Sequence, residues 1–178
     1  MRVAILGFGL IGGSLARALA EAADRDAWSV AAWSPTGDGP RRAAADGVIA
    51  LAASAPAEAL EGAHLVVLAA PPTGTLTLIE RLGDGLGGAL EPGAVITDVA
   101  STKGAIVAAA TERGLRFVGG HPMAGRETSG YGEQLLAFRA SLDPDQDVHF
   151  TRAPGSSLLA HARAPCPSAS RGRRGSRA

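Results

Sequence analysis

The chain has 178 residues, of which 46% are hydrophobic and 19% are charged, so it can bury the core of one globular domain of ordinary size. A single cysteine, Cys166, excludes an internal disulfide and a cysteine-rich metal site, and we expect no metal site of another kind. No apolar run approaches the roughly 20 residues that span a bilayer, and the first residues lack the pattern of a secretory signal, so a cytoplasmic location is expected.

Strand-like and helix-like runs alternate along the first 120 residues. Short apolar runs predict strands at 2–6, 28–33, 47–50, 64–70, 93–100 and 116–120. The segments between them predict helices at 10–23, 40–46, 73–86 and 102–114. Such alternation across short loops is typical of right-handed βαβ units and a parallel sheet. We therefore expect a Rossmann-like, doubly wound α/β fold with a mainly parallel sheet, occupying residues 1–137.

A glycine-rich loop stands between the first predicted strand and the first predicted helix. It reads G-x-G-x-x-G and consists of Gly7, Phe8, Gly9, Leu10, Ile11 and Gly12. In this position the first glycine makes a tight turn, the second lets a pyrophosphate approach the backbone, and the third lets helix and strand pack closely. The helix start adds free N–H groups and a positive dipole end. The loop therefore predicts a dinucleotide-binding site formed by these six residues.

The end of the second strand bears on the choice of dinucleotide. An acid that binds the ribose 2′-hydroxyl is expected about 20 residues beyond the loop, but Ser34 stands there in "AAWSPTG". A serine can bind a hydroxyl or a phosphate and does not repel the latter. Arg41 and Arg42 follow, and they either face a 2′-phosphate or are solvated on an exposed helix. The pattern favours NADP slightly and leaves NAD open.

Three later strands end in polar or turn-forming segments, "AAPPTG", "TDVASTKG" and "GGHPMAG". Ligands of open α/β sheets lie beyond the carboxyl ends of the strands, so Pro71, Ser101 and His121 are expected near the nicotinamide. An unperturbed histidine has a pKa near 6.5, which suits a base working near neutral pH, so His121 is a candidate base. Ser101 could also be only the N-cap of the following helix. Lys103 sits where the helix dipole disfavours a cation, which hints at an anionic ligand.

The motifs "GFGLIGGSLA", "DVASTKGAI" and "GGHPMAGRETSG" together resemble the prephenate/arogenate dehydrogenase family of tyrosine biosynthesis, over about residues 1–135. The resemblance implies oxidative decarboxylation of prephenate or arogenate, with hydride passed to NAD or NADP. It implies that His121 binds the ring hydroxyl and accepts its proton. It also implies that Ser101 orients His121 and the hydroxyl, and that Glu127 lines the substrate pocket. From the residues alone, Glu127 could equally favour a helix start.

The end of the chain departs from the family pattern. The family would continue with a helical domain that forms a homodimer and binds the substrate carboxylates. Residues 138–178 are instead rich in Arg, Ala, Pro and Ser, and from residue 151 onward there are six arginines and no acid. This composition predicts a disordered or irregular tail. The tail is either a basic arm for nucleic acid or acidic partners, or the product of a frameshift or truncated gene model, which we favour.

Two other functions remain open at this stage. Since half of the substrate site is missing, the chain could be a catalytically silent dinucleotide-binding module. A different hydroxyacid dehydrogenase on the same fold is disfavoured by "HPMAGRETSG". The sequence does not separate prephenate from arogenate, because the discriminating contacts are expected in the absent domain.

Overall fold

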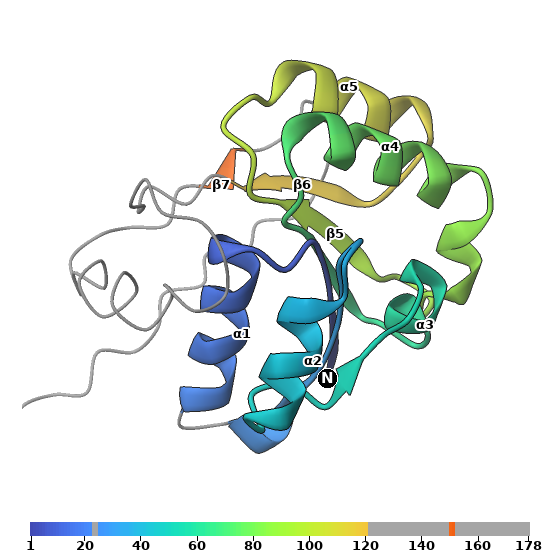
Figure 1. The fold of residues 1–178 in the computed structure, drawn as a ribbon. Coiled ribbons are helices and arrows are strands. Elements are labelled where there is room, and N and C mark those ends of the chain that lie inside the picture. The colour runs from blue at the N-terminus through green and yellow to red at the C-terminus, as the bar shows by residue number, and fades with distance from the viewer. Residues whose placement is uncertain (23–24, 121–149, 152–178) are drawn as a thin grey trace, which may run out of the picture.

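The computed structural model of the protein describes residues 1–22, 25–120 and 150–151 (Figure 1). The strands are β1 (Arg2–Leu6), β2 (Ser29–Trp33), β3 (Leu51–Ala52), β4 (Leu65–Leu68), β5 (Val95–Asp98), β6 (Phe117–Gly120) and β7 (Phe150–Thr151). The helices are α1 (Leu10–Glu21), α2 (Asp38–Ala45), α3 (Pro56–Leu60), α4 (Pro72–Gly83) and α5 (Gly104–Glu112), with 3-10 turns η1 (Arg25–Ala27) and η2 (Leu86–Ala89).

The strands form one sheet in the order β3-β2-β1-β4-β5-β6-β7. Neighbouring strands from β3 to β6 are parallel, and β7 pairs antiparallel with β6. After β3 the chain returns to the other side of β1, so the winding direction changes between β1 and β4. This order is that of a doubly wound Rossmann-like fold, and the predicted fold class is confirmed.

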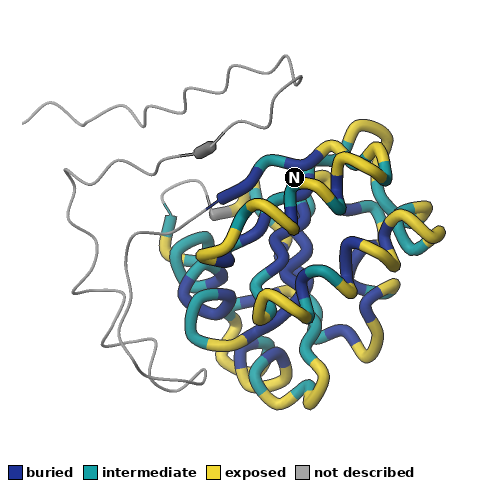
Figure 2. Tube along the Cα trace, turned by 90° about the horizontal axis from the view of Figure 1, so that it is seen from above, coloured by how far each residue is buried: buried dark blue, intermediate teal, exposed yellow. Residues whose placement is uncertain are grey.

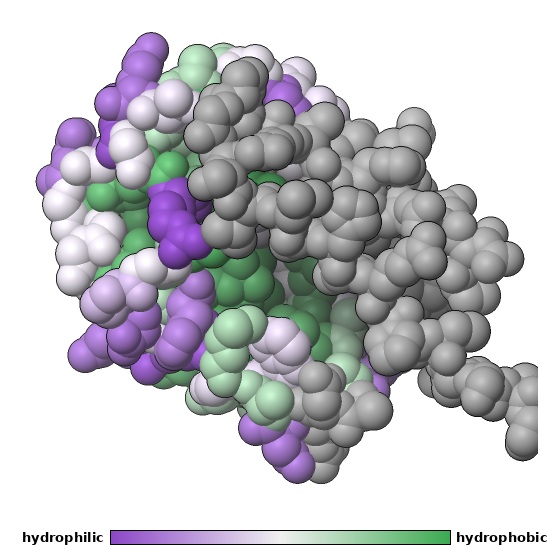
Figure 3. All heavy atoms as spheres, turned by 180° about the vertical axis from the view of Figure 1, so that it is seen from behind, coloured by the Kyte–Doolittle hydropathy of each residue, from purple (hydrophilic) through white to green (hydrophobic). Residues whose placement is uncertain are grey.

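Apolar residues fill both faces of the sheet. One buried cluster joins β1, β2 and β4 to α1 and α2, and the other joins the sheet to α3, α4 and α5. Figure 1 shows these helices on opposite sides of the strands. Viewed from above, buried segments occupy the middle and exposed ones the outer turns (Figure 2). From behind, apolar residues gather in the centre of the visible face and hydrophilic residues border them (Figure 3).

The segment between β2 and β4 differs from the prediction. The predicted strand at 47–50 is wrong, because Gly47 adopts a φ of 69° and its N–H bonds the Ala44 carbonyl at 3.0 Å, which ends α2. The strand follows instead as β3, only two residues long. Helix α3 is absent from the prediction because its five residues, PAEAL, are too few to show helical periodicity. The other predicted elements are confirmed with ends that differ by at most three residues.

The tail predicted to be disordered or irregular contains the two residues of β7, Phe150–Thr151. They pair with Gly120 and Gly119 of β6. The remainder of residues 138–178 lies outside the described part of the chain.

Candidate dinucleotide site

The three glycines of the loop between β1 and α1 have three different surroundings. Gly7 has a φ of 97°, and a Cβ built there would lie 2.5–2.6 Å from the backbone of Ala69 and Ala70 after β4. A Cβ on Gly12 would overlap the Gly7 carbonyl oxygen and press on the side chains of Ala69 and Ile5. Gly7 therefore makes the turn, and Gly12 lets α1 pack on the sheet, as expected of the first and third glycines.

Gly9 is the exception, because a Cβ built on it meets nothing within 4 Å. It is the N-cap of α1, and no side chain caps the helix there. The first N–H groups of a helix have no acceptor within the helix, and they carry the positive end of its dipole. At Gly9 the backbone thus borders open space at a helix start, which is the local geometry that an anionic phosphate needs.

A cleft of about 730 Å³ opens from this point. It is lined by Gly7, Phe8, Gly9, Leu10, Ile11, Trp33, Ser34, Pro35, Thr36, Gly39, Ala69, Ala70, Pro71, Gly74, Thr77, Leu78 and Arg81. The lining comes from the ends of β1, β2 and β4 and from one side of α4, so the cleft lies across the switch in strand order. Of the predicted cofactor residues, all but Gly12 and Ser101 line it. Gly12 contributes by packing beneath the loop.

At the β2 end of the cleft, Ser34 closes a tight turn. Its Oγ accepts a hydrogen bond from the Gly37 N–H at 3.3 Å, and the hydroxyl proton remains available to a ligand. Arg41 is exposed and forms an ion pair with Asp38 at 2.5 Å and a hydrogen bond to the Thr36 carbonyl at 3.3 Å. Neither Arg41 nor Arg42 lines the cleft.

Asp98, at the carboxyl end of β5, joins the two neighbouring loops. Its side chain is fully buried, and its Oδ2 accepts bonds from Lys103 Nζ at 2.5 Å and from the Ala100 N–H at 3.1 Å. Its Oδ1 accepts a bond from the N–H of Gly120, the last residue of β6, at 3.2 Å. The carboxylate therefore ties the loop after β5 to the point where the chain leaves β6.

Asp98 was not identified from the sequence, and Lys103, the partner of Asp98, was interpreted there as a sign of an anionic ligand. The lysine that hinted at an anionic ligand has its anion within the protein, since Lys103 Nζ contacts the Asp98 carboxylate. The signal that could have found this pair is an acid at the end of a buried strand, five residues before a lysine.

The N-cap reading of Ser101 is wrong. Helix α5 begins at Gly104, its N-cap is Lys103, and no side chain caps it. Ser101 is exposed in the loop that Asp98 anchors. His121 and Glu127 lie outside the described residues, but Gly120, which directly precedes His121, is bonded to Asp98.

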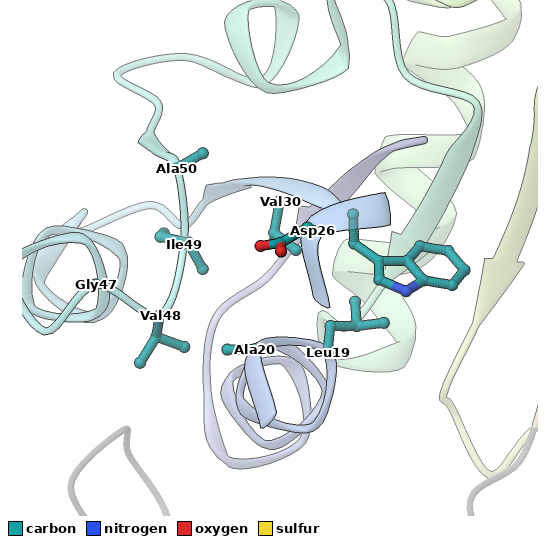
Figure 4. A pocket seen from close by; sticks show the side chains of 9 residues that line it. Leu19, Ala20, Asp26, Val30, Gly47, Val48, Ile49 and Ala50 are labelled. Carbon is teal, nitrogen blue, oxygen red and sulfur yellow. The ribbon is translucent and has the colours of Figure 1, made fainter. Parts of the chain in front are cut away.

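A second cavity, of about 350 Å³, lies at the opposite edge of the sheet (Figure 4). Leu19 and Ala20 from α1, Val30 near the start of β2 and Ile49 line it, and among the described lining residues Asp26 is the one that ionises. It lies at the amino ends of the strands, away from the glycine loop, and it lacks the features of a phosphate site. Within the described residues no group of three or more His, Cys, Asp or Glu could hold a metal ion.

The sequence was compared with known proteins. It matches the family model of the prephenate dehydrogenase nucleotide-binding domain over residues 36–138, which is more than half of the chain. The chain belongs to this family. The match begins after the glycine loop and includes the segment with His121. A comparison with curated protein sequences finds no match.

Solved structures of this family have the same fold. Arogenate dehydrogenase from Synechocystis is 28% identical, with a TM-score of 0.64, and the match covers 81% of this chain and 56% of that one. Prephenate dehydrogenase from Aquifex aeolicus, solved with hydroxyphenyl propionate and NAD+, is 27% identical, with a TM-score of 0.61 and coverages of 74% and 45%. A Corynebacterium glutamicum protein, provisionally assigned as a prephenate dehydrogenase, is 34% identical, with a TM-score of 0.59 and coverages of 74% and 40%.

The chain thus spans about half the length of the solved family members that it matches. It carries the nucleotide-binding domain of a family of dehydrogenases. None of its described helices is long and apolar enough to cross a membrane.

Proposed function

We propose that this chain is the cofactor-binding part of an NAD(P)-dependent prephenate dehydrogenase, which converts prephenate to 4-hydroxyphenylpyruvate by oxidation and decarboxylation. The observation that carries the proposal is the contrast within the glycine loop. Two glycines are packed against backbone, while Gly9 alone borders open space at a helix start. Together with the family match over 36–138, this geometry favours a dinucleotide and the family's reaction.

The residues of the cleft fit a dinucleotide along its whole length. The backbone of Gly7 to Gly12 and the start of α1 would hold the pyrophosphate. Ser34 would hold the ribose of the adenosine half, and Pro71 would border the nicotinamide half at the start of α4. When bound, the nicotinamide supplies the acceptor for a hydride. A side chain at position 9 would project into the space proposed for the pyrophosphate. A glycine therefore suits this position, and a larger residue would compete with the phosphate.

The chemical step is assigned to the segment after β6. His121 is proposed to bind the ring hydroxyl of the substrate and to accept its proton as hydride leaves the same carbon. Ser101 is proposed to orient His121 and the hydroxyl, and Glu127 to line the substrate pocket. The bonds that Asp98 accepts from the N–H groups of Ala100 and Gly120 support a pairing of Ser101 with His121. They hold together, at the carboxyl ends of β5 and β6, the two chain segments that lead to these residues.

The substrate carboxylates require basic residues, which in the family come from a second, dimer-forming domain. Loss of carbon dioxide makes the ring aromatic, so the protein has only to align hydride acceptor, base and carboxylate. Arogenate in place of prephenate is the second candidate, favoured by the arogenate dehydrogenase among the similar structures. A dinucleotide-binding module without turnover is the third, because the chain spans about half of those proteins.

One experiment separates these candidates. Product formation from prephenate and from arogenate, with NAD and with NADP, would be measured for this chain and for a version whose reading frame continues into a helical domain. We expect turnover of prephenate in the extended version and very low turnover in the chain of 178 residues. Dinucleotide binding without turnover in either version would favour the silent module, and turnover of arogenate alone would favour the second candidate.

A further inference from the structure

Among the described residues that line the dinucleotide cleft, one side chain is ionisable, and it is a cation. In this set only Arg81 on α4 carries a charge, and there is no Asp or Glu. The remaining walls are glycines, apolar residues and three hydroxyl-bearing side chains. An anionic ligand group would therefore meet a guanidinium in this cleft and no carboxylate that repels it.

Arg81 lies on the side of α4 that faces the cleft. Gly74, Thr77, Leu78 and Arg81 all line it, and they follow the three- and four-residue spacing of one helix face. The start of α4 is next to the glycine loop, because Gly7 packs on the backbone of Ala69 and Ala70. At about 1.5 Å per residue, Arg81 is roughly 14 Å farther along the helix axis than Pro72. That separation places Arg81 away from the pyrophosphate cradle.

The guanidinium of Arg81 is available to a ligand. The residue is exposed, and its side chain makes no hydrogen bond or ion pair with any other residue in the described part of the chain. Arg41, the other cation considered from the sequence, differs in this respect because Asp38 and the Thr36 carbonyl already engage it. An arginine has five N–H donors in a planar fork that matches two phosphate oxygens at once.

We propose that Arg81 is a specificity-determining residue that binds the 2′-phosphate of NADP across the cleft from Ser34. This inference rests on the proposed dinucleotide function and adds the group that selects between the two cofactors. Ser34 has no charge with which to repel the phosphate, and Arg81 provides the charge that attracts it. NAD has a hydroxyl at the same place and gains little from a guanidinium.

The test measures binding of NADP, NAD, 2′,5′-ADP and 5′-AMP to the full chain by calorimetry. In Arg81→Met, which keeps an apolar stem of similar length, affinity for NADP and 2′,5′-ADP should fall about ten- to hundredfold, the range of a charge-assisted contact. Affinity for NAD and 5′-AMP should change less than about twofold, a small fraction of that range. Arg81→Lys should keep part of the NADP preference, because a point charge remains.

Two further variants complete the design. Arg116→Met removes the same charge at the amino end of β6, where Arg116 bonds the Gly93 carbonyl, and it should leave all four affinities unchanged. Arg41→Met tests the competing cation. Equal losses of NADP and NAD affinity in Arg81→Met would overturn the proposal and point to contact with the adenine ring. Loss of NADP affinity in Arg41→Met, with no loss in Arg81→Met, would overturn the proposal and assign the 2′-phosphate to Arg41 on α2. If the parent chain binds none of the four ligands, the dinucleotide function itself fails, and the proposal with it.

Discussion

The starts of α1 and α5 lie at the same edge of the sheet, yet their surroundings are opposite. At α1 the N-cap is Gly9, where a Cβ would meet nothing within 4 Å among the described residues and no side-chain capping bond is made. At α5 the N-cap is Lys103, whose ammonium is held by the buried carboxylate of Asp98. One helix start is left open to a ligand, and the other is occupied by the protein's own ion pair.

The difference indicates that the two helix starts at this sheet edge have different roles. The start of α1 is proposed to bind the cofactor through backbone groups, so its requirement is a glycine at one position. The closed start at α5 fixes the positions of neighbouring segments, because Asp98 bonds both the loop after β5 and the end of β6. Binding is thus expected to depend on the first region, and alignment of the reacting groups on the second.

The largest expected effect lies in the second region and concerns His121. In a version that includes the substrate domain, His121→Asn should lower turnover about 10²- to 10⁴-fold, the usual contribution of a positioned base. Cofactor affinity should hardly change, because the role proposed for His121 is at the ring hydroxyl of the substrate and not at the phosphates of the cofactor. Steady-state kinetics together with dinucleotide titration checks both parts. Turnover within about threefold of the parent, well below that range, would show that His121 is only a loop residue.

Asp98 provides the next largest effect, on stability. Asp98→Ala removes three hydrogen bonds and leaves the ammonium of Lys103, only 21% exposed, without its counter-charge. Breaking such a pair costs about 3–5 kcal/mol of unfolding free energy. Urea denaturation of Asp98→Ala and of the parent would measure this loss of unfolding free energy.

Lys103→Met serves as the matched variant for Asp98→Ala. It keeps the bonds from Asp98 to the backbone N–H groups but leaves the fully buried carboxylate without its counter-charge, so we expect a loss of the same order, about 3–5 kcal/mol. An Asp98→Ala protein as stable as the parent would show that the buried pair does not hold the two loops.

The two regions also differ in how far the sequence predicted them. The backbone geometry of the glycine loop could be predicted, because G-x-G-x-x-G between a strand and a helix defines a local geometry whose parts are close in sequence; that the loop binds a dinucleotide stays a prediction. The bond of Asp98 to Gly120 was not predicted, because Gly120 is 22 residues away and meets Asp98 only through strand pairing, and the bond to Lys103, five residues away, was missed. The N-cap assigned to Ser101 was wrong for a related reason, since the loop held by Asp98 delays the helix start to Gly104.

The glycine loop gives a prediction in which binding and stability separate. Gly9→Val should fold as the parent does, because Gly9 has a negative φ of −91° and a Cβ built on it meets no atom of the described residues within 4 Å. It should lose dinucleotide affinity by about tenfold or more, the cost of an overpacked contact with the pyrophosphate. Unchanged affinity in Gly9→Val would contradict the assignment of the cradle.

Gly7→Ala is the matched control, with the opposite expected result. Its φ of 97° and the backbone atoms of Ala69 and Ala70 leave no room for a methyl group. Unfolding free energy should fall by about 2 kcal/mol, from backbone strain and overpacking together. Thermal or urea denaturation of the two variants side by side measures the separation.

The smallest expected effect concerns Glu58, an acidic residue in the first turn of α3 with the opposite charge to Lys103. One carboxylate oxygen of Glu58 accepts bonds from the Ser54 hydroxyl and the Ser54 N–H, each at 2.7 Å. The Ser54 hydroxyl, and then the backbone N–H groups, lower the pKa of Glu58 below its usual value of 4.5, against a weaker opposing effect of desolvation. A carboxyl group whose pKa is lower in the folded state stabilises the fold above its unfolded pKa and loses that contribution as pH falls through the folded pKa.

Glu58→Gln should therefore be slightly less stable than the parent near neutral pH, and the difference should shrink as the pH is lowered below 4.5. The midpoint of thermal unfolding, followed from neutral to acidic pH for both proteins, measures this. A difference between Glu58→Gln and the parent that stays constant with pH would mean that the ionisation of Glu58 does not affect stability. In that case the charge of Glu58 contributes nothing at the start of α3, and only its hydrogen bonds to Ser54 do.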